Sequence, residues 1–346
     1  MLQLKTAIIG STGYGGVELI RLLQQHPELE LTMLISTSQA GVCLHHVYPH
    51  LAHLAYAYED FDLDQVTQQV DLLFFATPPG ISSKWTPFLI EQGKIVIDLS
   101  GDFRLKQPDL YKKWYGIPSA PESLLQKAVY GLSEWYSKDI QTASLISNPG
   151  CYPTATLLAL LPLLQENILD PSSIIIDAKS GVTGAGRSLN QKMLYGEVNE
   201  NLRPYKVDGH QHIPEIEQFA SIFAQKEITV SFIPHLIPMN RGILVSIYGS
   251  YMHKYTNKQL YELYQDVYRS SPFIRIQQEA WPETKAVQGS NYCDIGFHVD
   301  ERTGRIVVLA AIDNLMKGAA GQAVQNANLR IGCLEETGLL YSPLYP

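Results

Sequence analysis

The chain has 346 residues, a formal net charge of −8 and 45% hydrophobic residues. This length exceeds what one small core requires, and the composition is that of a soluble globular protein, so two domains are expected. The acidic balance excludes a general nucleic-acid binder, which would carry a basic patch. The longest strongly apolar run, 157–164, is far too short to span a bilayer.

The four cysteines, Cys43, Cys151, Cys293 and Cys333, are widely spaced and include no Cys-x-x-Cys pair, so no zinc site is predicted. No signal peptide is apparent, because the first apolar stretch, 6–10, runs straight into a glycine-rich loop. We therefore expect a cytoplasmic protein with reduced thiols.

The first part of the chain alternates short apolar strands with helical patterns. This alternation predicts a doubly wound parallel sheet, which binds its ligands beyond the carboxyl ends of its strands. The loops 10–16, 36–38, 77–80 and 100–104 would all lie at that edge. The expected strands are 4–9, 30–35, 71–76 and 94–99, and the expected helices are 17–25 and 85–92.

A second domain is expected to begin near Asn148. A helix at 154–164 is followed by strands at 173–178, 228–233, 242–248, 292–298 and 306–312, which predict a mixed or antiparallel sheet. The last helix, 319–329, is rich in small residues, which permit close packing, so it could return to the first domain. The predicted boundaries are 1–148 with 314–346, and 149–313.

Three glycines follow the first predicted strand with the spacing Gly-x-x-Gly-x-x-Gly, at Gly10, Gly13 and Gly16. A glycine turn between a strand and a helix lets the backbone approach a pyrophosphate, which then lies at the helix N-terminus. The region that would hold the ribose is 36–38, where Ser36, Thr37 and Ser38 provide hydroxyls and no carboxylate. Because a carboxylate would repel a 2′-phosphate, NADP is favoured weakly over NAD.

Cys151 lies on a turn, two residues before Pro153 and just ahead of the helix predicted at 154–164. The positive end of that helix would lower the thiol pKa and raise the fraction of reactive thiolate. The other three cysteines are interpreted as small buried apolar residues, the usual role of a free cysteine.

Two histidines precede a helix predicted at 215–224, with Pro214 as its first residue. In extended chain His210 and His212 would point the same way. The helix dipole would keep the imidazoles neutral, and a neutral imidazole can act as a base near pH 7. A surface pair and a metal site including Glu215 are the alternatives, although no third metal ligand is evident.

Three arginines could hold an anionic substrate through paired N–H groups: Arg104, Arg187 and Arg241. Taken alone, each is interpreted as a structural or surface arginine.

These segments together resemble the N-acetyl-γ-glutamyl-phosphate reductase family over nearly the whole chain. The resemblance is carried by the cofactor loop 10–16, by 98–104, by the run Ile146-Ser147-Asn148-Pro149-Gly150-Cys151-Tyr152-Pro153-Thr154-Ala155, and by 130–134, 180–187, 210–215 and 313–320. Family members often carry a basic residue where this chain has Thr37.

The resemblance implies a Rossmann-type NADP-binding domain, completed by the C-terminal helix, and an α+β catalytic and oligomerisation domain, akin to aspartate-semialdehyde dehydrogenase. A homodimer or homotetramer is implied. The implied cofactor is NADP(H), with no metal and no nucleic-acid or membrane partner. The implied site residues are Cys151, His212, His210 and Glu215 for catalysis; Gly10, Ser11, Thr12, Gly13, Tyr14, Gly15, Ser36, Ser38, Pro78, Gly184 and Asn314 for the cofactor; and Arg104, Asn148 and Arg187 for the substrate.

The implied reaction is the NADPH-dependent reductive dephosphorylation of N-acetyl-L-glutamyl 5-phosphate to the semialdehyde, in arginine biosynthesis. Cys151 would form a thioester, and His212 or His210 would transfer the proton. Three alternatives stay open: a reductase of another acyl phosphate (aspartyl phosphate or carrier-linked aminoadipyl phosphate), a nucleotide-binding sensor or scaffold, and a metal-dependent hydrolase built on the histidine pair.

Overall fold

The computed structural model describes residues 3–345. They form two compact units. Unit 1 runs to Pro149 and includes Ala319–Leu340, and unit 2 comprises Gly150–Gly318 and the chain from Tyr341 on.

Unit 1 is built on a seven-stranded sheet in the order β3-β2-β1-β4-β5-β7-β6, and every pair in it is parallel. The central strands are buried on both faces, as apolar strands covered by helices should be. This confirms the predicted parallel sheet. The strands are β1 (Leu4–Ile9), β2 (Leu29–Ile35), β3 (Tyr58–Glu59), β4 (Leu72–Phe75), β5 (Ile95–Asp98), β6 (Val129–Tyr130) and β7 (Leu145–Ser147).

Because these strands are parallel, the loops after β1, β2, β4 and β5 lie at one edge of the sheet, as predicted. The helices of this unit surround the sheet, with their apolar residues in its core. They are α1 (Tyr14–Leu23), α2 (Leu44–Val47), η1 (Pro49–Leu51), α3 (Leu63–Gln69), α4 (Ser82–Glu91), α5 (Pro108–Tyr115), α6 (Glu122–Lys127) and α7 (Ser133–Ile140).

Helix α12 (Gly321–Ile331), near the end of the chain, belongs to unit 1. The Asn326 side chain donates to the Gly131 carbonyl at 2.8 Å and to Asn148 Oδ1 at 3.0 Å. The returning segment is shorter than the predicted 314–346, because the tail from Tyr341 on lies in unit 2. There the Leu344 N–H donates to the Gln288 carbonyl, and the Leu344 side chain packs on Gly289.

Unit 2 contains a second seven-stranded sheet, in the order β12-β13-β14-β11-β8-β10-β9. It is mixed, as predicted, because β8 with β10 and β12 with β13 are parallel pairs and the others are antiparallel. The strands are β8 (Ile175–Gly181), β9 (Arg203–Pro204), β10 (Ser231–Ile237), β11 (Ile243–Ser250), β12 (Ile274–Ile276), β13 (Cys293–Asp300) and β14 (Arg305–Ile312).

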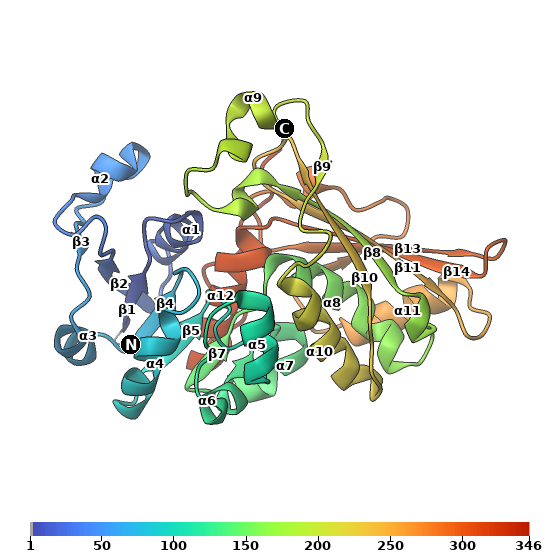
Figure 1. The fold of residues 1–346 in the computed structure, drawn as a ribbon, viewed down its shortest axis with the longest axis horizontal. Helices are drawn as coiled ribbons and strands as arrows, with labels where there is room; N and C mark the ends of the chain where they lie inside the picture. The colour runs from blue at the N-terminus through green and yellow to red at the C-terminus, as the bar shows by residue number, and fades with distance from the viewer. Residues whose placement is uncertain (1–2, 346) are drawn as a thin grey trace. The chain divides into compact units, whose positions relative to one another are not determined.

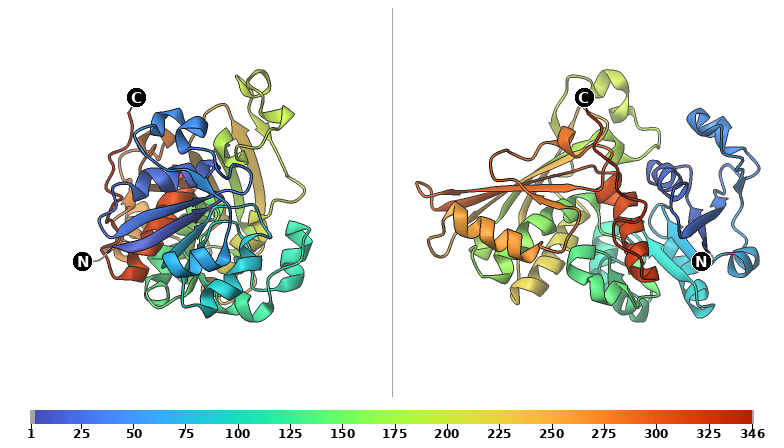
Figure 2. Two further views of the ribbon diagram at one scale, coloured as in Figure 1. Left: turned by 90° about the vertical axis from the view of Figure 1, so that its left-hand side faces the viewer. Right: turned by 180° about the vertical axis from the view of Figure 1, so that it is seen from behind.

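The long helices of unit 2 cover one face of this sheet (Figure 1). The view from behind in Figure 2 shows α11, in orange, along the same face. The helices are α8 (Cys151–Gln165), α10 (His212–Ala224) and α11 (Asn257–Val267), and the shorter elements are η2 (Pro171–Ser173), η3 (Val182–Ala185), η4 (Gln191–Met193), α9 (Tyr195–Val198), η5 (Thr284–Ala286) and the π-helical turn η6 (Met316–Ala320).

Helix α8 is buried around nearly its whole circumference and carries Pro162 inside. A proline has no N–H for the carbonyl four residues earlier, which here is that of Leu158. The Tyr268 hydroxyl donates to this carbonyl at 2.5 Å, and the buried Tyr264 hydroxyl donates to the carbonyl of Ala159. The Tyr268 hydroxyl therefore replaces the bond that the helix lacks at Leu158.

Within residues 3–345, every helix is too short or too polar to cross a membrane.

Candidate active site

Cys151 is the first residue of α8, with Gly150 as the extended N-cap residue (φ −68°, ψ 157°). The helix begins three residues earlier than predicted, because Pro153 occupies its third position, where the N–H has no partner within the helix. No side chain caps this helix at Gly150. The thiol of Cys151, which is half-buried, therefore lies at the positive end of the helix.

The His212 ring lies against Gly150. A Cβ built on Gly150 would be only 2.4 Å from His212 Nε2, so glycine is the residue that lets the imidazole approach the start of α8. The carboxylate of Glu215, which is fully buried, accepts the Gly150 N–H at 2.8 Å. Glu215 was predicted as a catalytic residue, and this contact with the backbone of the cysteine loop was not foreseen.

Helix α10 begins at His212, so the prediction that both histidines precede the helix is wrong for His212. Pro214 is its third residue and not its first, for the same reason as Pro153 in α8. The chain at Gln211 is also helical (φ −59°, ψ −14°) and not extended. The two rings still meet, with centroids 4.7 Å apart, because the turn into the helix brings them together.

Gly318, in the turn η6, lies on another side of the cysteine. A Cβ at Gly318 would be 2.9 Å from Cys151 Cβ, so only glycine fits there. Asp313 holds this turn, since its Oδ1 accepts the N–H groups of Leu315 and Met316 at 2.8 and 3.1 Å. Gly318 belongs to the segment 313–320 that carries the family resemblance, but the sequence predicted no role for it.

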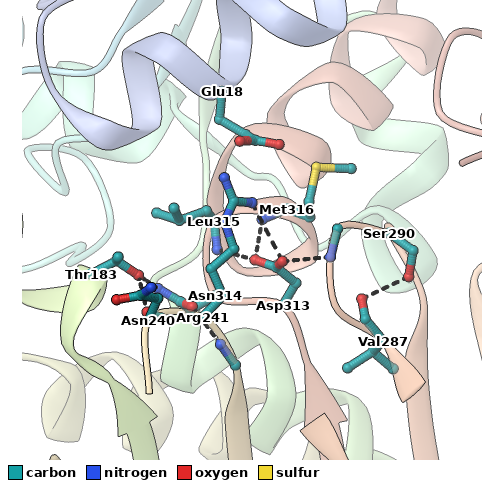
Figure 3. Close-up of polar contacts among 12 residues, drawn as sticks. Glu18, Thr183, Asn240, Arg241, Val287, Ser290, Asp313, Asn314, Leu315 and Met316 are labelled. Carbon is teal, nitrogen blue, oxygen red and sulfur yellow. Dashed lines mark hydrogen bonds and ion pairs between the residues drawn. The ribbon is translucent and has the colours of Figure 1, made fainter. Parts of the chain in front are cut away.

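Asn314, predicted to bind the cofactor, has both ends of its side chain in contact with unit 2 itself (Figure 3). Its Oδ1 accepts the Gly242 N–H at 2.8 Å, and its Nδ2 donates to the Thr183 hydroxyl at 3.0 Å. Asn314 thereby ties the loop 180–187 to β11. Gly184, also predicted for the cofactor, is exposed in that loop.

The two arginines of this unit differ in their surroundings. Arg187 is exposed just after Gly186, whose φ of +80° favours glycine. Arg241 Nη1 lies 3.4 Å from Oδ2 of the buried Asp313 (Figure 3).

In unit 1 the predicted cofactor loop has the geometry of a phosphate cradle. Helix α1 begins after Gly13, again extended (φ −81°, ψ 168°) and without a side-chain cap. A Cβ on Gly10 or Gly16 would lie 2.5 or 2.6 Å from the backbone of Ala76 or Ser11, whereas one on Gly15 would meet nothing within 4 Å. The turn is therefore packed against backbone at Gly10 and Gly16 and leaves free space at Gly15, as the binding of a pyrophosphate requires.

Hydroxyl groups line the ends of β1 and β2. Ser36 Oγ lies 3.5 Å from Thr12 Oγ1 and 3.4 Å from Ser38 Oγ, while Ser11 Oγ donates to the Ile35 carbonyl. Thr37 is exposed beside them. The set fits a ribose that bears a 2′-phosphate, since no carboxylate belongs to it.

The loop after β4, which includes the exposed Pro78, is held by Asp102. This carboxylate accepts the N–H groups of Gly80 at 2.7 Å and Ser83 at 2.8 Å, and the Tyr111 hydroxyl at 2.7 Å. Burial, followed by the charge of Asp102, raises the pKa of Asp98 above its ordinary range. The sequence predicted no role for Asp102, so its hydrogen bond to the first turn of α4 is a finding of the structure.

Arg104 and Asn148, predicted to bind substrate, both make buried contacts within unit 1. Arg104 donates from Nε to the Asn148 carbonyl and from Nη2 to the Leu99 carbonyl, each at 2.9 Å. Asn148 Nδ2 donates to the Ala319 carbonyl at 3.1 Å. These bonds fix the chain just before the cysteine loop.

No group of three or more His, Cys, Asp or Glu side chains is arranged to hold a metal ion in residues 3–345.

Two family models cover most of the chain. Residues 5–143 match "Semialdehyde dehydrogenase, NAD binding domain", and residues 151–314 match "Semialdehyde dehydrogenase, dimerisation domain". The fold is similar to that of aspartate semialdehyde dehydrogenase II from Vibrio cholerae, with a TM-score of 0.73, 18% identity, and coverage of 96% of this chain and 99% of that one. A related enzyme from Candida albicans, solved with NADP, gives a TM-score of 0.67 at 14% identity, with 94% and 98% coverage. The chain is therefore of the semialdehyde dehydrogenase class.

Relatives of similar sequence identify the family within this class. An N-acetyl-gamma-glutamyl-phosphate reductase of Bacillus cereus (strain AH187) is 51% identical over 99% of this chain and 100% of its own length. One of Bacillus anthracis is 50% identical with the same coverage. The chain belongs to the N-acetyl-gamma-glutamyl-phosphate reductase family.

Proposed function

We propose that this protein reduces N-acetyl-L-glutamyl 5-phosphate to N-acetyl-L-glutamate 5-semialdehyde with NADPH, a step of arginine biosynthesis. The observation that carries the proposal is the start of α8, where the His212 ring lies against Gly150, the residue directly before Cys151. Family membership supports the identity of the acyl group.

The first half-reaction is an acyl transfer to the thiol. The Cys151 thiolate attacks the acyl-phosphate carbonyl carbon, a C–S bond forms, and the bond to phosphate breaks, which leaves a thioester and inorganic phosphate. The positive end of α8 favours the thiolate. The Cys151 N–H, at the helix start, is suited to stabilise the oxyanion that forms on the carbonyl.

The second half-reaction releases the aldehyde. When bound, NADPH supplies the hydride that reduces the thioester carbon. His212 is suited to give a proton to the resulting oxyanion and to take it back as the C–S bond breaks, since its ring lies beside the residue that precedes Cys151. Cleavage of the C–S bond then restores the thiolate.

The residues of unit 1 fit the proposed cofactor. The uncapped start of α1 and the open position at Gly15 suit the pyrophosphate, and the Thr12, Ser36 and Ser38 hydroxyls suit the 2′-phosphate. On the substrate side, Arg187 is exposed and suited to hold an anionic group. The buried bonds of Arg104 and Asn148 instead support a role in shaping the site.

The decisive experiment is the reverse reaction with N-acetyl-glutamate semialdehyde, inorganic phosphate and NADP. We expect phosphate-dependent formation of NADPH that is lost when Cys151 is alkylated or replaced by Ser. Substantial turnover by Cys151→Ser would refute the thioester. Faster turnover of aspartate semialdehyde would instead assign the protein to another acyl phosphate.

The matched dimerisation model supports a homodimer formed through unit 2. The sheet face opposite α8 presents half-exposed apolar side chains in adjacent registers, such as Tyr248 opposite Val307. A second copy would cover this face. Leu309→Arg should then yield monomers in analytical ultracentrifugation, whereas an unchanged mass would exclude this face.

None of the four cysteines forms a disulfide bond, which suits the reducing environment of the cytoplasm.

A further inference from the structure

His210 is enclosed by aromatic rings, although it lies only two residues from His212. Its ring is 4% exposed and meets Tyr152, Tyr205 and Phe232 with centroid distances of 5.7, 5.6 and 5.5 Å. Tyr152 also contacts the His212 ring at 6.0 Å, so the two histidines share one aromatic wall. Such packing leaves His210 little freedom to reorient during a reaction.

The hydrogen bond of His210 determines which of its nitrogens carries a proton. The His212 N–H donates to His210 Nδ1 at 3.1 Å, so Nδ1 must be an acceptor, and the neutral ring carries its proton on Nε2. A doubly protonated ring would bring two donors together at this bond. Burial, followed by the charge of Lys206, lowers the pKa of His210 to about 3, which agrees with this neutral state.

This bond serves the N-terminus of α10. The His212 N–H is one of the four helix N–H groups without an intrahelical partner, and the N-cap residue Gln211 provides no side-chain cap. His210 supplies the missing acceptor, as a serine or aspartate would at an ordinary N-cap. Glu215, one turn further on, holds the Gly150 N–H at 2.8 Å. The first turn of α10 is thus fixed at two points, with the His212 ring between them.

We infer that His210 is a positioning residue, a neutral hydrogen-bond acceptor that fixes the first turn of α10, and that the proton carrier at Cys151 is His212. The inference rests on the proposed function and assigns different roles to two histidines that the sequence left equivalent. Its physical basis is precision, because an acid–base group displaced by about 1 Å loses on the order of a hundredfold in rate.

The test compares two amides at one position. Asn in place of His210 puts its amide oxygen near the position of Nδ1, whereas Gln puts it near that of Nε2. We expect H210N to lose roughly three- to tenfold in kcat and H210Q on the order of a hundredfold, with the KM for substrate changed less than kcat in both. The pH profile of H210N should keep its wild-type shape. H212N should lose about 10²–10⁴-fold and the ionisation that His212 contributes to that profile.

Thermal unfolding of each variant verifies that it is folded. Equal losses in H210N and H210Q, or loss of the ionisation in H210N, would overturn the inference and make His210 the proton carrier. Wild-type rates in H210Q would overturn it as well. The rate of Cys151 alkylation by iodoacetamide as a function of pH needs no substrate. Its profile should match wild type in H210N and shift toward that of H212N in H210Q, which tests the positioning role even if the proposed reaction fails.

Discussion

Helices α1 and α8 begin in the same way but in different surroundings. Each follows a glycine N-cap in extended conformation, and neither has a side-chain cap. At α1 a Cβ on Gly15 would meet nothing within 4 Å, whereas at α8 a Cβ on Gly150 would meet the His212 ring at 2.4 Å. The start of α1 is open to an anion from solution, while that of α8 carries the thiol of Cys151.

The difference shows that an uncapped helix N-terminus can favour either a bound anion or a negatively charged side chain. Free N–H groups and a positive dipole end favour any negative charge. Where the surroundings are empty, the charge can be a ligand's phosphate. Where a histidine and a carboxylate close around the helix start, the same features favour the thiolate that the proposed reaction requires of Cys151. Substitutions at the two helix starts should therefore fail in different ways.

The largest effect is expected for Gly150→Ala. The new Cβ would displace the His212 ring from the start of α8, and we expect kcat to fall on the order of a hundredfold or more. NADPH affinity, measured by fluorescence titration, should stay near wild type. Gly196→Ala is a matched control, because a Cβ there meets nothing within 4 Å. A Gly150→Ala enzyme with wild-type kcat would contradict the contact.

Gly16→Ala should disturb α1 instead. Its Cβ would lie 2.6 Å from Ser11 Cα, which is backbone and cannot rotate away. We expect about 2 kcal/mol less unfolding free energy, by urea denaturation, and weaker NADPH binding. Gly15→Ala should gain up to about 1 kcal/mol as a better helix former. Equal stabilities of these two variants would contradict the predicted difference between a closed and an open position.

Tyr268→Phe would leave the Leu158 carbonyl, which Pro162 deprives of its helix donor, without the tyrosine hydroxyl. We expect a loss of about 1–3 kcal/mol in urea denaturation, the cost of an unsatisfied buried acceptor. Tyr261→Phe, within α11 and half-buried, should change stability much less. The prediction fails if both variants unfold alike.

The low pKa of His210 predicts a pH-dependent stability. Its neutral folded form takes up no proton until about pH 3, whereas the same side chain in the unfolded chain takes one up near the ordinary histidine pKa of 6.5. The neutral His210 therefore contributes fully to the free energy of unfolding above pH 6.5. This contribution is lost as the pH falls, by about 1.5 kcal/mol between pH 6.5 and 5. The stability difference between wild type and H210N should therefore change over that range, and a constant difference would disprove the assignment.

Thr37→Arg should raise the affinity for NADPH at the cofactor site beside α1. A guanidinium beside the Ser36 and Ser38 hydroxyls would pair with a 2′-phosphate, and we expect about tenfold tighter NADPH binding, roughly 1.4 kcal/mol. NADH binding should not tighten. An equal gain for both cofactors would show that the effect is general charge attraction.

Local patterns predicted much of the fold. The range of β1 was predicted to the residue, and the parallel and mixed sheets followed from the alternation of elements. The helix starts at Cys151 and His212 were placed two or three residues late. In both, the proline is the third helical residue, and the sequence alone does not distinguish this from the first, since neither position needs an N–H.

Side-chain partners were harder to predict. Glu215 meets Gly150, and Asn326 meets Gly131, across 65 and 195 positions of sequence. No local period encodes such pairs, because they depend on how complete elements pack. The sequence therefore supplied the candidate residues, while the carbonyls bound by Arg104 and the contacts from which we infer separate roles for the two histidines emerged only from the structure.

The place of α12 also bears on how the chain matures during synthesis. A ribosome releases the sheet of unit 1 long before residues 319–340, so the carbonyl of Gly131 and the side chain of Asn148 lack their partner Asn326 until residues 150–318 have been made. Most of unit 2, including its whole sheet, is synthesised in that interval. The sheet of unit 1 thus emerges before that of unit 2 but receives its last helix after it, and a message truncated before α12 would yield a nascent protein whose N-terminal unit lacks the Asn326 side chain that satisfies these buried polar groups.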